Sequence, residues 1–423
     1  MSEQTKSCFA KTFSELPGYL KKCPVEFLLS LTYFILAEYA IIKGVEETAI
    51  QLLFFFPFIV IAFTLNRYGL KWVYYPSYLL WLLGPVLVDS SERWDCGTIQ
   101  YVMVYVISVI ALFLPPKISN NVDYSRQTAH FLKSIGLACL ISLAIMTVLL
   151  LIFYSLVFLF GWNTDEEKWL LSLCAFAGIL VLPPLSCSLI LGRDVKEKAS
   201  SALSAVLNFV LSPALIIYTV ILYAYIASIL HKGELPNGGV AYMVLAYILV
   251  SLGCYILGGH LENKPFLWFY RWFPAIAVGP VVLLWMGTLR RISDYGFTTS
   301  RVYLFALVIL TTVFLIMLMF EKTRNFKYMV LAFGITAVLL TYIPGISADR
   351  IAIANQQRRL ETVLPIVCEN GRFKKPDNKA MADDEELRKD WEQARSAIYY
   401  LKSNMKTVEF NKAYGSLGSI PLR

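Results

Sequence analysis

The chain has 423 residues, of which 57% are hydrophobic and only 16% are charged, and its formal net charge is +8. Soluble proteins contain about 25% charged and roughly 45–50% apolar residues, so this composition excludes an ordinary soluble protein and a disordered, collagen-like or disulfide-rich chain. The apolar residues occur in long blocks. They predict an all-α, polytopic transmembrane helix bundle in a lipid bilayer, with a small helical C-terminal segment outside it.

The first predicted element lies within residues 1–24, ahead of the apolar blocks. Phe9, Phe13, Leu16 and Leu20 follow one another at steps of four, three and four residues, and lysines lie close by. Apolar residues at this spacing form one face of a helix, and basic neighbours favour an anionic membrane surface. We therefore expect a short interfacial helix on the cytoplasmic leaflet.

Residues 25–346 form the predicted transmembrane domain. It contains eleven apolar stretches, each close to the length that a helix needs to cross about 30 Å of hydrocarbon. The predicted spans are Val25–Ile42, Ala49–Leu65, Val73–Val88, Ile99–Leu114, Ile135–Phe160, Trp169–Leu191, Ala202–Leu230, Gly239–Leu257, Phe273–Leu289, Val302–Phe320 and Tyr328–Ile346. The third and fourth stretches are short and contain or adjoin prolines, so each also fits a re-entrant or interfacial segment.

The distribution of Lys and Arg predicts the orientation of the bundle. The N-terminal segment and the loops on its side hold seventeen basic residues, whereas the opposite loops hold seven. Because basic loops stay in the cytoplasm, the N-terminus is predicted to be cytoplasmic in a bacterial inner membrane. Eleven spans then place residues 347–423 in the periplasm. Ten or twelve spans would return them to the cytoplasm, and this alternative stays open.

The C-terminal segment, residues 347–423, has a soluble composition. A helix is predicted over Asp349–Leu364 with its end at Pro365, followed by a loop over Asn370–Asn378. Residues Thr407–Arg423 show no periodicity and are expected to be disordered.

A second C-terminal helix is predicted to begin at the acidic turn Asp383–Glu386, which suits the positive end of a helix dipole. Its apolar residues recur at steps of four and three, which is typical of a narrow heptad seam packed along one partner helix. They are Leu387, Trp391, Ala394, Ile398, Leu401 and Met405. The partner is either the preceding helix of the same chain or a second copy of the chain, and the sequence does not decide between them.

Motifs for catalysis, metal binding and cofactor binding are missing from the sequence. It contains no Walker A loop, G-x-G-x-x-G, H-E-x-x-H or G-x-S-x-G pattern, and its eight cysteines lack metal-ligand spacing. We therefore expect no metal and no cofactor. Nucleic acid is not an expected partner, because the basic residues follow the membrane orientation. Cys96 and Cys368 are the two cysteines predicted outside, where a disulfide is stable.

The loop at residues 290–301 departs from the charge bias, because three arginines lie on the predicted outer side. They would pair with Asp294 and with backbone carbonyls, or they would bind an anionic lipid or another anionic envelope ligand. Gly296 is suited to the turn, and Thr298 or Thr299 to the cap of the next helix. A structural helix–turn–helix junction and an anion site both remain open. The candidate residues are Arg290, Arg291, Asp294, Tyr295, Gly296, Thr298 and Arg301.

The same loop carries a recognisable pattern. Residues 291–301 read R-I-x-x-Y-G-x-T-x-x-R, and residues 355–361 and 370–373 read N-Q-Q-R-R-L-E and N-G-R-F. They resemble the signature loop, the post-membrane helix and the short turn of a bacterial, Bacteroidetes-type membrane family, domain of unknown function number four-one-five-three. The resemblance implies a multi-span inner-membrane protein, and it implies no activity.

Polar residues and prolines inside the spans form a second candidate site. Pro183 and Pro184 interrupt the sixth span, and Pro213 interrupts the long seventh. Broken helices expose backbone carbonyls in transporters, although prolines are also common packing kinks. Glu38 lies within the first span, either paired with Lys43 at the membrane surface or used for proton or cation coupling. The candidate intramembrane residues are Glu38, Ser186, Asn208, Ser212 and Pro213.

Three functions therefore remain open. A transporter or flippase for an anionic or amphiphilic envelope substrate predicts a polar cavity lined by Asn208, Ser212, Ser186 or Glu38. A non-catalytic anchoring or signalling protein predicts a closely packed bundle. A membrane enzyme acting on a lipid-linked substrate predicts a cleft in which the 290–301 side chains converge with an acid or a base. The sequence does not indicate the substrate, the energy source or the oligomeric state.

Overall fold

The computed structural model describes residues 22–44, 52–83, 98–116, 120–160, 166–192, 204, 206–232, 240–258, 265–369, 372–373 and 384–415. The described chain is helical apart from one pair of short strands, so the predicted all-α architecture is confirmed. It divides into two compact units. Unit 1 is Met1–Phe209, Ile256–Lys264 and Asn325–Gly334, and unit 2 is Val210–Tyr255, Pro265–Arg324 and Ile335–Arg423. The predicted interfacial helix lies outside the described residues.

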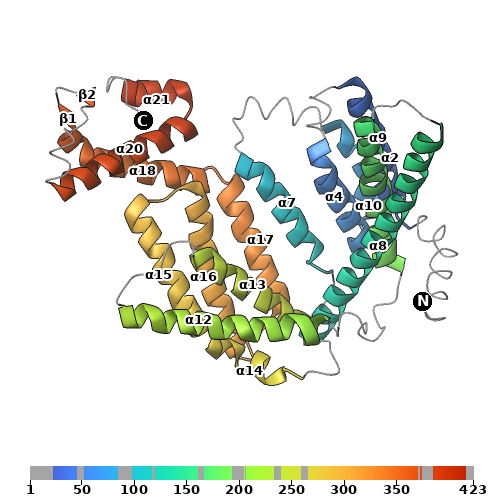
Figure 1. The fold of residues 1–423 in the computed structure, drawn as a ribbon, viewed down its shortest axis with the longest axis horizontal. Coiled ribbons are helices and arrows are strands. Elements are labelled where there is room, and N and C mark those ends of the chain that lie inside the picture. Colours follow the sequence, from blue (N-terminus) through green and yellow to red (C-terminus); the bar gives the residue numbers. More distant parts are fainter. Residues whose placement is uncertain are drawn as a thin grey trace. The chain divides into compact units, whose positions relative to one another are not determined.

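Unit 1 contains the N-terminal helices, with α2, α4, α8 and α10 packed side by side (Figure 1). Its helices are α2 (Pro24–Lys43), η1 (Leu52–Phe54), α4 (Phe55–Tyr68), α5 (Lys71–Tyr74), η2 (Pro76–Leu82), α7 (Thr98–Leu112), α8 (Asn121–Phe160), α9 (Glu166–Ala175), η3 (Phe176–Val181) and α10 (Leu182–Gly192). The helix η4 (Val206–Leu211) carries the chain from unit 1 into unit 2.

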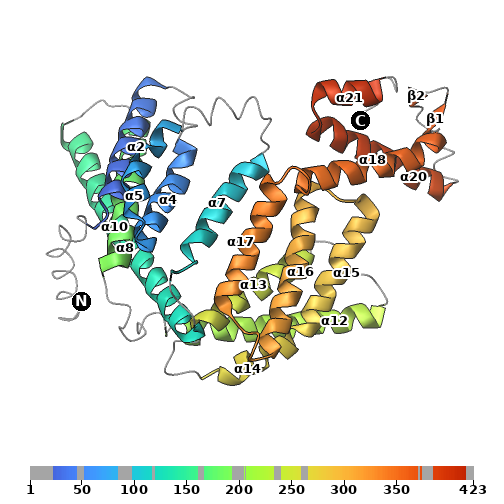
Figure 2. The same cartoon turned by 180° about the vertical axis from the view of Figure 1, so that it is seen from behind.

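Unit 2 contains the later helices and the C-terminal segment, and Figure 2 shows α18 and α20 lying along one another. Its elements are α12 (Ser212–Lys232), α13 (Val240–Gly258), α14 (Leu267–Ile276), α15 (Val278–Tyr295), α16 (Thr299–Met319), α17 (Phe326–Tyr342), α18 (Ala348–Val367), β1 (Cys368–Glu369), β2 (Arg372–Phe373), α20 (Glu385–Asn404) and α21 (Thr407–Tyr414). The ends of α13 and α17 that fall in unit 1 are residues 256–258 and 326–334.

Ten of the predicted spans coincide with apolar helices. Seven described helices are long and apolar enough to cross a membrane, namely Pro24–Lys43, Asn121–Tyr154, Glu167–Leu191, Val206–Lys232, Val240–Gly258, Leu267–Tyr295 and Thr299–Met319. The shorter apolar helices Phe55–Tyr68, Val102–Leu112 and Phe326–Tyr342 match the second, fourth and eleventh predicted spans. The protein is therefore an integral membrane protein with many helices in the bilayer.

The third predicted span, Val73–Val88, differs from the others. Its described part ends at Leu83 and consists of the end of α5 and the short helix η2, which begins at Pro76. Tyr75 has right-handed helical angles (φ −65°, ψ −46°), so the chain stays helical up to Pro76 and continues as the tighter 3₁₀-helix η2. The re-entrant or interfacial alternative for this span stays a prediction.

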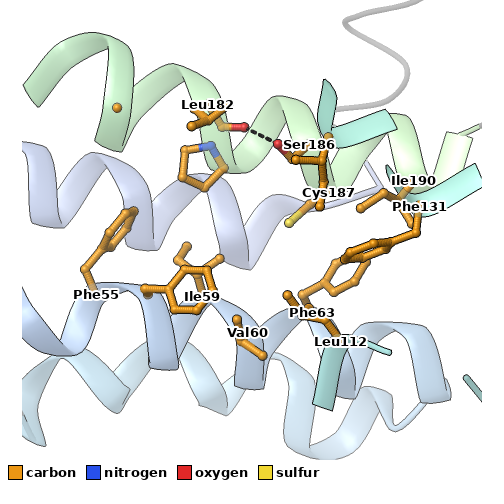
Figure 3. Close-up of a pocket in the computed structure, with 14 residues that line it drawn as sticks. Phe55, Ile59, Val60, Phe63, Leu112, Phe131, Leu182, Ser186, Cys187 and Ile190 are labelled. Atoms are coloured by element: carbon orange, nitrogen blue, oxygen red, sulfur yellow. Dashed lines mark hydrogen bonds between the residues drawn. The ribbon is translucent and has the colours of Figure 1, made fainter. Parts of the chain in front are cut away.

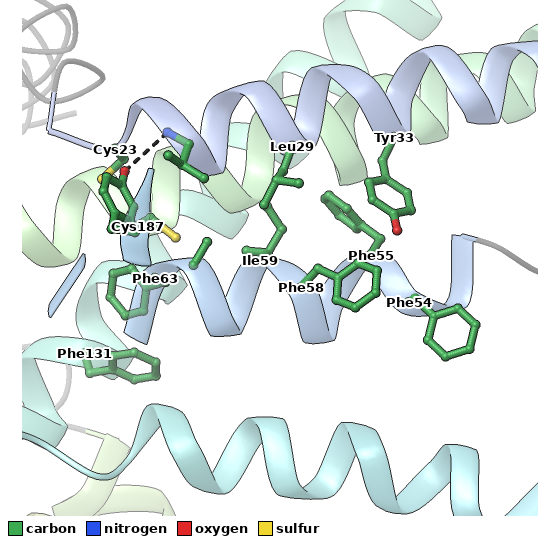
Figure 4. Close-up of a cluster of buried hydrophobic side chains, with 13 residues drawn as sticks. Cys23, Leu29, Tyr33, Phe54, Phe55, Phe58, Ile59, Phe63, Phe131 and Cys187 are labelled. Atoms are coloured by element: carbon green, nitrogen blue, oxygen red, sulfur yellow. Dashed lines mark hydrogen bonds between the residues drawn. The ribbon is translucent and has the colours of Figure 1, made fainter. Parts of the chain in front are cut away.

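The core of unit 1 is a cluster of aromatic and aliphatic side chains between α2 and α4 (Figure 4). Leu29 and Tyr33 of α2 pack against Phe58 and Phe63 of α4, and the rings of Tyr33 and Phe55 lie 5.2 Å apart. Because lipid tails are as apolar as these side chains, van der Waals packing rather than the hydrophobic effect holds the two helices together. This cluster therefore fixes α4, the helix that forms one wall of the cavity described below.

The C-terminal helices have a separate core in unit 2. Trp391, Ala394, Ile398 and Leu401 of α20 are buried against Leu360 and neighbouring residues of α18, so the predicted seam packs on the preceding helix of the same chain. The N-terminal cap of α20 is the Asp384 carboxylate, which accepts hydrogen bonds from the N–H groups of Glu386 and Leu387.

Three boundaries of the C-terminal segment differ from the sequence prediction. The helix α18 continues past Pro365 to Val367, because a proline near a helix end disrupts only the carbonyls of the preceding turn. Residues 407–414 form α21, whose Phe410 and Tyr414 complete the core, so their predicted disorder was wrong. Within the predicted loop, Arg372–Phe373 pairs antiparallel with Cys368–Glu369.

Candidate functional site

A cavity of about 320 Å³ lies in unit 1, between α4 and α10 (Figure 3). Its lining is predominantly hydrocarbon and comes from five helical elements. The residues of α4 are Phe55, Phe56, Ile59, Val60 and Phe63, those of η3 and α10 are Gly178, Leu182, Pro183, Ser186, Cys187 and Ile190, and α7 and α8 add Leu112, Phe131 and Ile135. Small-molecule sites have volumes of roughly 300–1,000 Å³ and mostly apolar walls, so this cavity is large enough for a ligand.

One wall of the cavity is the helix Glu167–Leu191, which contains a wide turn. Between α9 and α10 the chain makes the wide helical turn η3, in which the N–H of Leu182 bonds the carbonyl of Ala177, five residues earlier. The next two residues, Pro183 and Pro184, have no N–H. Wide turns of this kind occur frequently at functional sites. Pro183 and Pro184 lie in α10 directly after this turn, and the helix Glu167–Leu191 continues through them. The predicted interruption of the sixth span is therefore limited to a wide turn, which borders the cavity through Gly178.

The intramembrane residues predicted as a site occupy several environments. Ser186 lines the cavity and donates a 2.7 Å hydrogen bond to the carbonyl of Leu182. The Ser212 hydroxyl is buried and bonds the Tyr270 hydroxyl at 2.7 Å, ahead of Pro213 in α12. Asn208 is buried in the wide turn η4.

Glu38 of α2 accepts a 2.9 Å hydrogen bond from the Ser172 hydroxyl of α9, and its other oxygen is buried without a partner. The ion pairs of the described chain do not join Glu38 to Lys43. Among the predicted intramembrane residues, only Ser186 lines the cavity of unit 1. The cavity is accordingly apolar, whereas the transport hypothesis predicted a polar one.

A buried carboxylate that the sequence reading gave no role lies close to the same core. Glu26, at the start of α2, is fully buried and accepts hydrogen bonds from the Tyr74 hydroxyl at 2.5 Å and from the Asn66 amide at 3.1 Å. The Tyr74 hydroxyl in turn accepts a bond from the N–H of Val25. These partners belong to α4 and α5, so the residues next to Glu26 in the sequence do not predict them.

The signature loop in unit 2 connects α15 to α16 through Gly296, whose φ of 70° and ψ of −176° suit glycine alone. The Arg290 side chain lies 3.9 Å from the Asp294 carboxylate, and Arg301 donates to the carbonyls of Tyr295 and Gly296. Arg291 lies over the Tyr242 ring, with 5.2 Å between the guanidinium carbon and the ring centroid. The predicted pairing with an acid and with carbonyls is present.

The helix α18 packs onto this loop and satisfies its backbone. The Asn355 side chain accepts a 2.8 Å hydrogen bond from the N–H of Phe297, and Gln356 donates to the carbonyls of Tyr295 and Phe297 at 3.0 and 2.8 Å. Arg359 donates to the carbonyl of Asp294 at 2.9 Å. These contacts supply donors to the last carbonyls of α15, which a helix cannot satisfy internally.

The helix α20 caps the beginning of α16 from a distance in sequence. The Tyr400 hydroxyl accepts a 3.1 Å hydrogen bond from the N–H of Thr299 and lies 2.7 Å from the Thr299 hydroxyl. Thr299 donates its own hydroxyl proton to Asp349 at 2.7 Å. Thr298 occupies the N-cap position without a side-chain cap bond, so the predicted threonine cap is replaced by Tyr400.

The signature loop, α18 and α20 contact one another in what we call the loop–helix junction. It consists of Asp294–Arg301, Asn355, Gln356, Arg359 and Tyr400. Burial, and then the nearby charge of Arg301, lowers the pKa of Arg359, while Asp294 opposes this effect. The Nη1 atom of Arg359 and the Oε1 atom of Gln356 are buried without a hydrogen-bond partner. Because Arg301 and Arg359 donate to backbone carbonyls, most of the positive charge at the junction serves structure.

The sequence reading missed the contribution of α18 and α20 to this site. Asn355, Gln356 and Arg359 were part of the family resemblance, and their spacing of one and four places them on one helical face. Tyr400 carried no signal beyond its position next to the seam. The predicted partner of Cys368, Cys96, lies outside the described residues, so that disulfide stays a prediction.

The family model "Domain of unknown function (DUF4153)" matches residues 27–366. An uncharacterized protein of Pasteurella multocida (strain Pm70) is 29% identical over 280 residues, covering 66% of this chain and 47% of that protein. The chain thus spans about half the length of this curated relative. No solved structure matches the chain. Because the family match covers most of its length, the protein belongs to the DUF4153 family.

Proposed function

We propose that this integral membrane protein acts as a transporter- or flippase-like protein for an amphiphilic envelope substrate, the apolar part of which enters the cavity of unit 1. The observation that carries the proposal is the cavity of about 320 Å³, with its hydrocarbon lining, beside the wide turn η3 of the helix Glu167–Leu191. Wide turns of this kind occur frequently at functional sites. A substrate with a lipid-like tail fits such a lining better than a purely polar solute does.

The proposed setting is the bacterial inner membrane, with a cytoplasmic N-terminus and a periplasmic C-terminal segment, residues 347–423. The asymmetric distribution of basic residues supports this orientation. The 290–301 loop is the proposed contact for an anionic headgroup. Arg301 donates to carbonyls and Arg290 lies near Asp294, which leaves Arg291 as the main candidate contact.

The test is lipid translocation in proteoliposomes. Purified full-length protein is reconstituted with phosphatidylglycerol bearing a fluorescent nitrobenzoxadiazole group, and dithionite quenches only the outer leaflet. The protein should accelerate the loss of inner-leaflet fluorescence relative to protein-free liposomes. Ile59→Trp fills the cavity and should lower this rate, because Ile59 is buried in its wall.

The matched control is Ile61→Trp on the same helix, because Ile61 is 43% exposed and lies outside the cavity lining. Val60→Phe gives a second, smaller cavity-filling change if Ile59→Trp does not fold, as judged by thermal unfolding in detergent. A wild-type rate equal to that of empty liposomes would contradict the proposal. Equal rates for folded Ile59→Trp and Ile61→Trp would contradict the role of the cavity.

Non-catalytic anchoring or signalling is the second candidate, and the loop–helix junction favours it. There α18 and α20 bind directly to the ends of two membrane helices, so a force or ligand acting on the C-terminal helices would reach the bundle. This function predicts no translocation and no effect of either isoleucine substitution. The same assay therefore separates the two candidates.

A further inference from the structure

We propose that the cavity of unit 1 selects a neutral lipid-like chain carrying a hydrogen-bond donor, such as a long-chain alcohol, and that the backbone carbonyl of Gly178 accepts that hydrogen bond. The inference deepens the proposed function and rests on it in taking the cavity as the substrate site. Three features support it: the wide turn η3 followed by two prolines, the polar groups of the lining and the open space at Gly178.

The prolines after the wide turn η3 leave backbone carbonyls without donors along the helix. The carbonyl of Ala177 is satisfied by the N–H of Leu182 and by the Ser142 hydroxyl of α8 at 2.7 Å. The carbonyl of Gly178 would bond the residue five positions on, and this is Pro183, which has no N–H. Ile179 precedes Pro183 and Pro184 by four and five residues, so its carbonyl likewise lacks a donor within the helix.

The direction of the helix determines where the Gly178 carbonyl points. Carbonyls of a helix point along its axis toward the C-terminus, which here is toward Leu182 and Pro183. Gly178, Leu182 and Pro183 all line the cavity, so this carbonyl lies on the cavity side of the helix. A backbone polar group without a partner is costly in an apolar environment, and the interrupted backbone of membrane helices is tolerated where it borders a cavity.

The remaining polar groups of the lining act as acceptors rather than donors. The Ser186 hydroxyl uses its proton on the carbonyl of Leu182 and presents lone pairs to other groups. The Cys187 thiol is only a weak donor. A ligand that brings a donor therefore gains a partner, whereas a ligand that brings only an acceptor gains none.

The charge of the ligand follows from the same lining. No acidic or basic side chain is among the cavity residues. An ammonium or a carboxylate would lose its hydration without a counter-charge, and this cost is far larger than that of a hydroxyl. A neutral alcohol fits the site, because its chain meets phenylalanine and isoleucine side chains and its single proton meets the Gly178 carbonyl.

The space beside Gly178 permits this contact. A Cβ atom added at Gly178 would meet no atom within 4 Å, and the residue is exposed. The backbone is therefore accessible to a ligand, and a larger side chain at position 178 would enter open space without displacing protein atoms. Gly136 of α8 also has no atom within 4 Å of an added Cβ but does not line the cavity, which makes it a matched control.

The experiment uses the full chain in detergent micelles and the photoreactive alcohol 3-azioctanol as the probe. Labelled peptides are mapped by mass spectrometry, and the label should fall on α4 and α10. Protection by 1-decanol is compared with protection by decyl methyl ether, at equal concentrations in the micelle, because the ether has the same chain without the donor. We expect the alcohol to protect at an approximately tenfold lower concentration, the upper range for one hydrogen bond.

Two substitutions test the assignment to Gly178. Gly178→Leu should abolish labelling of α4 and α10, whereas Gly136→Leu should leave it unchanged. Pro183→Ala restores an N–H opposite the Gly178 carbonyl, so labelling should persist while the preference for alcohol over ether falls toward one. Pro213→Ala, in the seventh predicted span, should leave that preference intact.

The proposal is overturned if the ether protects as well as the alcohol, or if Pro183→Ala retains the full preference. Labelling is measured at equilibrium and requires no translocation. A protein that prefers the alcohol but does not translocate lipid would therefore overturn the transport role alone. A protein that translocates lipid without the preference would overturn the present inference alone.

Discussion

Unit 1 and unit 2 each contain a site where backbone groups lose their partners within a helix: the wide turn η3 in unit 1 and the Gly296 loop in unit 2. Only in unit 2 do other side chains replace those partners. At η3 the prolines leave the carbonyls of Gly178 and Ile179 without donors along the helix, next to an apolar cavity. At Gly296 the groups freed between α15 and α16 receive side chains from α18 and α20. The polar signature loop is therefore used mainly for structure, whereas the cavity that could hold a ligand is lined by few polar side chains.

The largest expected effect separates the two sites by the same substitution. Gly296→Ala combines a backbone conformation that suits glycine with a Cβ that would lie 2.6 Å from Arg359 Cδ and 2.8 Å from Asn355 Oδ1. We expect a loss of roughly 3 kcal/mol or more in the free energy of unfolding, measured by chemical denaturation in detergent. Gly178→Ala should change it by about 0.5 kcal/mol or less, because its Cβ meets open space. Equal losses would remove the contrast between the two sites.

An intermediate effect is expected at the centre of the loop–helix junction. Gln356→Leu keeps the approximate volume of the side chain but removes both hydrogen bonds to the Tyr295 and Phe297 carbonyls. Unsatisfied buried carbonyls cost about 1–3 kcal/mol, and α18 should become more sensitive to limited proteolysis. Arg358 lies two residues further along α18 and is exposed. The substitution Arg358→Leu is therefore the control, and it should leave the protease pattern unchanged. Equal protection of the two variants would argue against carbonyl capping by Gln356.

The smallest effect is expected at the distant cap. Tyr400→Phe removes the partner of the Thr299 N–H and should cost about 1 kcal/mol. Burial raises the pKa of Tyr400 above its usual value near 10.0, so folding favours the neutral phenol. The associated stability is complete below pH 10 and is lost as the pH rises through the raised pKa. Denaturation of both proteins between pH 8 and pH 12 should show their stability difference shrinking at the alkaline end; a constant difference would contradict this role.

Sequence patterns predicted the elements of this fold better than its sites. The spans follow from runs of apolar residues, and the seam from Trp391 to Leu401 follows from a repeat within one helix, so both depend on local order alone. The cavity depends on five helical elements from three regions of the chain, and its lining residues resemble any other apolar residues of a span. No local pattern distinguishes Phe63 in the cavity wall from a phenylalanine that faces lipid.

The sequence predicted the local contacts of the loop–helix junction but not the distant ones, for a similar reason. Gly296 and the arginines announced a turn because their chemistry is local, and the predicted pairing with Asp294 and with carbonyls is present. Arg359 and Tyr400 resemble solvated residues of a soluble helix until the fold places them on α15 and α16. Glu26 was passed over because its partners, Asn66 and Tyr74, lie on later helices.

The hydrogen bond from Thr299 to Tyr400 can form only after α20 has been synthesised. Thr299 and Tyr400 are 101 residues apart. At roughly 5–20 residues per second, a ribosome adds that stretch on the order of 5–20 s after α16 has begun to emerge. During that interval the start of α16 and the end of α15 lack the partners they have in the finished protein. Chains that end before α20 would lack the Tyr400 contact at the start of α16. We therefore expect such chains to be more sensitive to cellular proteases than chains that contain α20.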